Sequence, residues 1–273
     1  MKQGKSTTLS GRSEPVSRLH GVQETAGSIP VAPIMEWIFG NFMTGNEVVK
    51  LLKLWRDPKN VVGMARFGIS VKGTLGVPVP KLRDLAKKIK IDHELALGLW
   101  KTGIHEARIL ATMIADPVEF SSTQADAWTA DFDSWDTCDQ ACMNLYRWTP
   151  FTWKKIGEWA KDEREFVRRA AFALIAALAS GDKKSADAKF IALLPLIKKY
   201  SADERNFVRK AVNWALRGIG KRNLRLNAAA VAVAKKIQKL DSKTARWIAA
   251  DALRELTDPK IIAMTKRRGI EAQ

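Results

Sequence analysis

The chain has 273 residues, of which 46% are hydrophobic and 27% charged, and these values are typical of a folded globular protein. Lysine and arginine number 46 against 29 acidic residues, so the formal charge is +17. Such an excess points to a polyanionic partner, nucleic acid or an anionic membrane surface, although a generally basic proteome would also explain it. Two cysteines exclude a disulfide scaffold, and no apolar run is long enough to span a membrane.

The first 34 residues differ from the rest of the chain. They are rich in serine, threonine, glycine, proline and charge, and they contain no tryptophan, phenylalanine or tyrosine. We expect a disordered tail over residues 1–34, without the apolar core of a secretory signal, and a single domain over residues 35–273. Met35 or Met43 is an alternative start of the natural chain, which peptides from upstream of Met35 would exclude.

From Thr44 onward the pattern is helical. Thr44 and Glu47 have the spacing of a capping box, apolar residues follow at helical spacing, and Asp57-Pro58 ends the predicted helix. A glycine-rich stretch covers residues 68–80, and Pro80 suits the first turn of the next helix. Few windows alternate with period two, so the sequence predicts an all-α fold.

One internal repeat is clear. Residues 162–170 read DEREFVRRA and residues 203–211 read DERNFVRKA, an offset of 41, while residues 104–115 are a weaker third copy. A helix-pair unit of about 40–47 residues is typical of HEAT-like repeats, which stack into a solenoid of antiparallel helix pairs. We expect a concave basic groove on its inner wall, suited to a duplex backbone. The residues expected to face the core are Phe166, Val167, Ala170, Leu174, Phe207, Val208, Ala211 and Ala215.

The segment FDSWDTCDQ (132–140) contains a candidate catalytic residue. Trp135 and Asp139 stand four residues apart, on one face of a helix that should begin near Ser134. A carboxylate beside an indole is poorly solvated, so it can act as a general base, a nucleophile or a fixed negative charge. The alternative is that Asp139 is a solvated surface acid.

Two later positions are also candidates. Arg168 and Arg169 point about 100° apart on a helix, so at most one faces a groove centrally and the other would bind a phosphate or an acid at the rim. A solvated helix face is the alternative. Trp214 falls where the aligned copy has Ala173, so the repeat does not require an aromatic residue there. A local role and core packing both remain open for Trp214.

Other residue types lack the spacing that their chemistry needs. His93 and His105 have no partner at metal-ligand spacing, and Cys138 and Cys142 are not in a C-x-x-C motif. The glycine-rich stretch does not match a phosphate-binding loop. The sequence therefore predicts no metal and no cofactor.

Four segments resemble one known family. They are MARFGISVKGTLGVPVPKLR (64–83), W-x-x-x-D (135–139), FVRRAA (166–171) and FVRKAVNWALR (207–217), and in this order they resemble the AlkD-like DNA alkylation repair glycosylases over roughly residues 44–268. The resemblance implies a HEAT-like solenoid that excises positively charged N3- and N7-alkylated purines from double-stranded DNA. It implies no metal, cofactor or membrane, and we expect a monomer in the cytoplasm, associated with the nucleoid.

The resemblance also implies roles for individual residues. Asp139 matches the essential carboxylate, and Trp135 and Trp214 match the tryptophans that flank the lesion nucleotide. Arg169 matches the active-site arginine, which we expect to grip a backbone phosphate. Phe67 stands where the family has a DNA-contacting aromatic residue, often tyrosine, and here the hydroxyl is missing. The further DNA contacts that we expect are Lys72, Arg168, Lys210 and Arg217.

The chemistry of such a lesion favours a single carboxylate. A cationic purine leaves as a neutral base, so no general acid is needed, and we expect no second carboxylate of the usual glycosidase pair. Asp139 would stabilise the oxocarbenium-like sugar, with an attraction of about 4 kcal/mol at ~4 Å and an effective dielectric of about 20. Relatives that have lost the catalytic set only bind DNA, so the main alternative is a non-catalytic HEAT-repeat DNA-binding protein. The third interpretation is a HEAT-repeat scaffold that binds acidic proteins.

Overall fold

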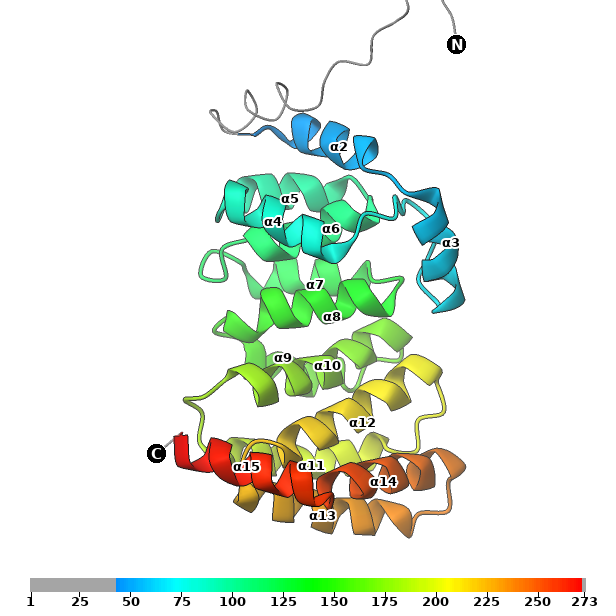
Figure 1. The fold of residues 1–273 in the computed structure, drawn as a ribbon, viewed down its shortest axis with the longest axis vertical. Coiled ribbons are helices and arrows are strands. Elements are labelled where there is room, and N and C mark those ends of the chain that lie inside the picture. Colours follow the sequence, from blue (N-terminus) through cyan, green and yellow to red (C-terminus); the bar gives the residue numbers. More distant parts are fainter. Residues whose placement is uncertain (1–42, 272–273) are drawn as a thin grey trace, which may run out of the picture. The chain divides into compact units, whose positions relative to one another are not determined.

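The computed structural model describes residues 43–271, all within one compact unit, Phe42–Gln273. The predicted tail, residues 1–34, and the alternative start at Met35 lie outside these described residues. Over the described range the chain forms fourteen α-helices and one short 3-10 helix, with no strand (Figure 1). The expected all-α class is confirmed.

The helices of the first half are α2 (Gly45–Leu54), α3 (Pro58–Arg66), α4 (Val79–Ile89), α5 (His93–Lys101), α6 (His105–Ile114), α7 (Ser122–Ala130) and α8 (Trp135–Asn144). Those of the second half are η1 (Tyr146–Trp148), α9 (Thr152–Trp159), α10 (Glu165–Gly181), α11 (Asp187–Tyr200), α12 (Asn206–Gly220), α13 (Leu224–Gln238), α14 (Lys243–Leu256) and α15 (Pro259–Glu271).

These helices stack as pairs in two layers. The even layer consists of α4, α6, α8, α10, α12 and α14, each packed against the next. Helices α5, α7, α9, α11 and α13 form the odd layer, and its members pack against helices of the even layer (Figure 1). One helix pair cannot bury its apolar face alone, so the core runs continuously between the layers. This arrangement is the predicted HEAT-like stack.

The local signals near the start of the described chain hold. Thr44 and Glu47 form a capping box in which each side chain bonds the other residue's backbone N–H. Asp57 caps α3 through the backbone N–H of Lys59, and Pro58 is the first residue of α3. The pair Asp57-Pro58 therefore separates two helices, and the sequence analysis missed the second. Pro80 lies in the first turn of α4, as expected.

The internal repeat is a repeated helix start. Asp162 accepts hydrogen bonds from the backbone N–H and the guanidinium of Arg164, directly before α10. Asp203 makes the same bonds with Arg205, directly before α12. The shared DER motif is therefore an aspartate–arginine turn that opens two neighbouring helices of the even layer.

The predicted core faces of the repeat need one correction. The valine, alanine and leucine positions of both copies are buried, but Phe166 and Phe207 are only half-buried. The centres of these two rings lie 5.4 Å apart, and the rings pack against each other at the starts of α10 and α12. The first turn of each helix extends past the core, so these phenylalanines pack on each other instead. Phe207 also closes on Gly68, where a Cβ would lie 2.7 Å from Cζ of the Phe207 ring, and Gly68 has a φ of +76°.

Candidate active site

A cavity of about 680 Å³ opens between α3, the linker that joins α3 to α4, and helix α8. Trp135 and Asp139 line it from α8, Trp214 lines it from α12, and Phe67 lines it from the end of α3. We call this cavity the site pocket. The structure thus brings together four residues that the sequence analysis singled out from three separate segments.

Helix α8 places its residues by dividing them between two faces. Cys138, Ala141 and Cys142 are fully buried, and the two thiols point at backbone carbonyls of α10. The opposite face carries Trp135 and Asp139, together with other residues of the site pocket. The helix begins at Trp135, directly after Ser134, where the sequence predicted its start.

Asp139 is held in a buried ion pair. Its two carboxylate oxygens accept hydrogen bonds from Arg169, Oδ1 from Nε at 3.0 Å and Oδ2 from Nη2 at 2.7 Å. The Asp139 side chain is 13% exposed, so it is not a solvated surface acid. Burial raises the pKa of Asp139, and the charge and hydrogen bonds of Arg169 oppose that rise. The fork fixes the orientation of the carboxylate in the site pocket.

Arg169 has no exposed donor surface to offer a phosphate. Its remaining Nη1 donates to the carbonyl of Phe207 at 2.6 Å, its guanidinium lies 5.9 Å from the Trp135 ring centre, and the residue is 5% exposed. The expectation that Arg169 grips a DNA phosphate is therefore wrong for this structure. The first turn of α12 and the carboxylate of Asp139 occupy the guanidinium, which makes Arg169 a positioning residue for Asp139.

Trp135 is tied to the opposite wall of the site pocket. Its indole Nε1–H donates to the carbonyl oxygen of Phe67 at 3.0 Å. A second tie lies beside it, because the backbone N–H of Ser70 donates to Ser134 Oγ at 2.8 Å. The Phe67 side chain itself is 72% exposed at the mouth of the pocket. These bonds hold the α3–α4 linker against the start of α8.

A buried glutamate fixes the rest of this linker. Glu106 is 1% exposed, and its carboxylate accepts hydrogen bonds from the backbone N–H groups of Leu75, Gly76 and Val77. Gly76 has a φ of +83°, and a Cβ there would collide with the backbone carbonyl of Asp57. The glycine-rich stretch is therefore a tightly held wall of the site pocket, and no sequence pattern indicates that Glu106 anchors it.

A second carboxylate also faces the site pocket. Asp136 lines it, and its Oδ2 lies 2.8 Å from Nε2 of the buried His105. Burial lowers the pKa of His105, but the hydrogen bond and charge of Asp136 outweigh this effect, so the pKa lies above its ordinary value. The expectation of no second carboxylate is wrong. The sequence carried the signal, because Asp136 stands three residues before Asp139 and so shares a helix face with it.

The comparisons with known proteins agree with this geometry. The family model described as DNA alkylation repair enzyme matches residues 48–256. The chain belongs to this family. No curated protein sequence matches the chain.

A solved structure gives a further likeness in fold. It is described as a new family of proteins related to the HEAT-like repeat DNA glycosylases with affinity for branched DNA structures. The match has a TM-score of 0.67 and 20% sequence identity, and it covers 82% of this chain and 98% of that chain. This likeness supports the HEAT-like fold of this member of the DNA alkylation repair family.

The basic residues that were expected to contact DNA fall into two groups in this family member. Arg168 pairs with Asp203 at 2.8 Å, so it binds an acid, one of the two ligands expected for it, and it is not on a solvated helix face. Arg217 pairs with Asp251 and with Glu255 of α14. Because these two guanidinium groups hold the even layer together, they do not match free phosphate contacts. The other two, Lys72 and Lys210, are exposed.

Two further observations concern the described part of this family member. Residues 43–271 contain no group of three or more histidine, cysteine, aspartate or glutamate side chains arranged to hold a metal ion. Within the same range, no helix is long and apolar enough to cross a membrane.

Proposed function

We propose that this member of the DNA alkylation repair family is a monofunctional DNA glycosylase. It hydrolyses the N-glycosidic bond of positively charged purines such as 7-methylguanine and 3-methyladenine, the first step of base excision repair. The observation that carries the proposal is a buried, oriented carboxylate, Asp139, in one cavity with two indoles, Trp135 and Trp214. Such a cavity would favour the positive charge of the alkylated base and the positive charge that develops on the sugar.

The reaction balances without an acid for the leaving group. The bond between sugar C1′ and the purine nitrogen breaks, and its electron pair neutralises the positive charge of the base. Water then bonds to C1′, and its proton passes to a carboxylate of the pocket. Asp139 stabilises the oxocarbenium-like sugar, and Arg169 keeps this carboxylate in one orientation. Asp136 adds a second negative group, backed by His105, that can accept the proton.

The magnitudes suit a substrate that is already activated. A carboxylate about 4 Å from the sugar cation gives roughly 4 kcal/mol at an effective dielectric of about 20, or about 10³ in rate. Arg169 reduces this figure because it shares the charge of Asp139. Each indole adds about 0.5–2 kcal/mol of cation–π attraction, which a neutral base does not gain.

The second candidate is a protein that binds DNA without cleaving the glycosidic bond. Two observations favour it: Asp139 is already neutralised by a bidentate arginine, and the matching solved structure is described by its affinity for branched DNA. Both candidates share the fold, so only the chemistry separates them.

Release of free 7-methylguanine from a methylated duplex under single-turnover conditions tests the proposal. We expect release by the wild type, a loss of up to about 10³-fold in Asp139→Asn, and no release of uracil from a uracil-containing duplex. Affinity for undamaged duplex should stay within about twofold in this variant, because the phosphate contacts are unchanged.

The fold of the Asp139 variant needs its own control. Removing a partner from a buried ion pair costs about 3–5 kcal/mol, so thermal unfolding must show that the variant is folded at the assay temperature. Trp214→Phe leaves the ion pair intact and should slow release by about tenfold through loss of cation–π attraction. Duplex binding by a wild type that releases no base would establish the second candidate. Equal release by wild type and Asp139→Asn would contradict the mechanism.

A further inference from the structure

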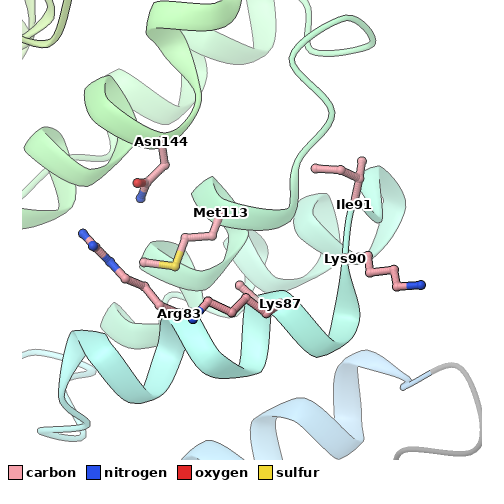
Figure 2. A pocket seen from close by; sticks show the side chains of 7 residues that line it. Arg83, Lys87, Lys90, Ile91, Met113 and Asn144 are labelled. Carbon is pink, nitrogen blue, oxygen red and sulfur yellow. The ribbon is translucent and has the colours of Figure 1, made fainter. Parts of the chain in front are cut away.

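A second cavity, of about 440 Å³, lies in the even layer at the C-terminal ends of α4, α6 and α8. Arg83, Lys87 and Lys90 line it from α4 and its cap, Met113 from α6 and Asn144 from α8. Figure 2 shows the Arg83 and Asn144 side chains reaching from opposite walls on the same side of Met113.

Helices α4 and α8 line both this cavity and the site pocket. Val79 begins α4 at the site pocket, and Lys90 caps the same helix at the second cavity. On α8, Met143 lines the site pocket while the next residue, Asn144, lines the second cavity. Eleven helical residues span about 16 Å, which is the rise of about five base pairs of duplex DNA. A duplex that runs along α4 from the site pocket would therefore reach the second cavity within half a turn.

Basic side chains follow α4 along this path. Arg83, Lys87 and Lys90 are spaced by four and three residues, so they share one helix face, and all three are exposed. Between Lys81 and Lys90 the chain carries five basic residues and one acid, Asp84. Lys87 pairs with Asp84 at 3.1 Å, but both side chains are mostly exposed, so the pair is weak and a phosphate can displace it.

The backbone at Lys90 supplies an independent observation. Lys90 has φ 68° and ψ −158°, and it is the sole non-glycine residue with positive φ in the described range. This region is essentially reserved for glycine, so a lysine there costs folding free energy. Glycine is the common solution after the last turn of a helix. A strained lysine on the rim of a basic cavity therefore points to a use for its side chain.

We propose that Arg83, Lys87 and Lys90, which we call the α4 ridge, bind the phosphodiester backbone of the duplex arm that leaves the site pocket. The proposal rests on the proposed function only in taking DNA as the ligand, since binding at the α4 ridge requires no base release. It extends the DNA contacts by about five base pairs on one side of the lesion.

A charge-matched pair of triple variants tests the α4 ridge. The test variant is Arg83→Ala/Lys87→Ala/Lys90→Ala. The control is Lys235→Ala/Lys236→Ala/Lys239→Ala, which removes three exposed lysines at the end of α13 in the odd layer. Fluorescence anisotropy of an undamaged duplex is measured between about 0.05 and 0.2 M salt.

For the test variant we expect a log–log salt slope that is shallower by about two to three, and an affinity at least about tenfold weaker at ~0.1 M salt. The control should change the affinity by less than about threefold, through net charge alone. A second duplex carries one central 7-methylguanine, which fixes the register of binding. Shortening this duplex by about five base pairs on one side of the lesion should remove the difference in affinity between wild type and test variant. Shortening the other side should preserve the difference.

Lys90→Gly separates a binding role from a structural one. This variant relieves the strained backbone, so the melting temperature should rise while the salt slope falls by about one. A higher melting temperature with an unchanged slope would overturn the role of Lys90, and a wild-type slope in the triple variant would overturn the α4 ridge. A reduced slope beside a wild type that releases no base would leave the α4 ridge standing and reject the glycosylase. Base release by the wild type, with an unchanged salt slope in the triple variant, would support the glycosylase and reject the α4 ridge.

Discussion

At the scale of single residues, the site pocket is built from charges that are paired before any ligand arrives. Asp139 is bound by Arg169, and Asp136 is bound by His105. Pairing lowers the cost of burying each carboxylate and fixes its direction. The two carboxylates therefore keep a fixed orientation in the site pocket, while their partners weaken the attraction for a cationic ligand.

The His105–Asp136 pair predicts how stability depends on pH. Burial lowers the pKa of His105, but Asp136, with the charges of Glu106 and Asp133, raises it further, so the folded pKa lies above the ordinary 6.5. The protonated histidine therefore stabilises the fold fully below about pH 6.5, and this contribution is lost as the pH rises through the folded pKa. Each unit of that rise is worth about 1.4 kcal/mol.

Urea unfolding at pH values between 6 and 9 measures this effect. The wild type should lose free energy of unfolding across the range, and His105→Gln should lose less, because it has no proton to release. Asp136→Asn should also weaken the pH dependence of the unfolding free energy between pH 6 and 9, since it removes the group that raises the pKa of His105. A decline in His105→Gln as steep as in the wild type would assign the pH dependence to other groups.

Sequence reasoning reached part of the site at this scale. Trp135, Asp139 and Trp214 were singled out by spacing and by their departure from the repeat, and they share one cavity. The partners of the charged groups were not predicted. Arg169 and Asp139 are 30 residues apart, and Glu106 meets the linker about 30 residues before it. Helical spacing predicts neighbours within one helix, whereas these contacts depend on how separate helices pack.

At the scale of elements, the aspartate–arginine turns offer an internal comparison. Both Asp162 and Asp203 bind the arginine two residues later at the start of a helix. Asp203 also binds Arg168 of α10, and its side chain is 7% exposed against 26% for Asp162. The same motif is therefore a surface turn in one copy and a buried junction between α10 and α12 in the other.

Asp203→Asn should cost about 2–4 kcal/mol of unfolding free energy, because it leaves Arg168 in a partly buried site without its carboxylate. Asp162→Asn should cost less than about 1 kcal/mol, because its arginine is solvated. Urea denaturation of the two variants side by side measures the difference. Equal costs would mean that the turn itself, and not the junction with α10, carries the energy.

Two predicted helix starts hold. The capping box at Thr44 forms, and α8 begins directly after Ser134, although the Ser134 side chain makes no capping hydrogen bond. Helix α3 was not predicted, because Asp57-Pro58 indicates the end of one helix as readily as the start of the next. Its nine residues, PKNVVGMAR, carry Val61, Met64 and Ala65 at helical spacing, so the signal was present but short, and none of these residues is buried.

At the scale of the described chain, stability is distributed unevenly along the stack. Helix α10 lies between α8 and α12 and buries most of its residues, so its opening requires separation from several helices. Helix α3 buries none, yet its Asn60, Gly63 and Met64 line the site pocket. Elements with few buried contacts open at low free energy, and ligand-binding segments are often drawn from them.

Amide hydrogen exchange should therefore be fastest in α3 and slowest in α10 among the described helices. Three bonds tether the α3 wall: Asn60 Nδ2 to the carbonyl of Gly76 at 3.0 Å, Trp135 Nε1 to the carbonyl of Phe67 at 3.0 Å, and Asp57 N–H to the carbonyl of Leu75 at 2.8 Å. Trp135→Phe removes one tether and should speed exchange in α3 severalfold without changing exchange in α12.

Binding of a methylated duplex should slow exchange in α3, because a ligand in the site pocket contacts this wall from inside. An undamaged duplex bound to the same extent is the control, and it should protect the α4 ridge more than α3. Exchange in α3 as slow as in α10 would show that the linker bonds alone make this wall rigid. In that case, entry to the site pocket would require motion of α8 or α12, which carry Trp135 and Trp214.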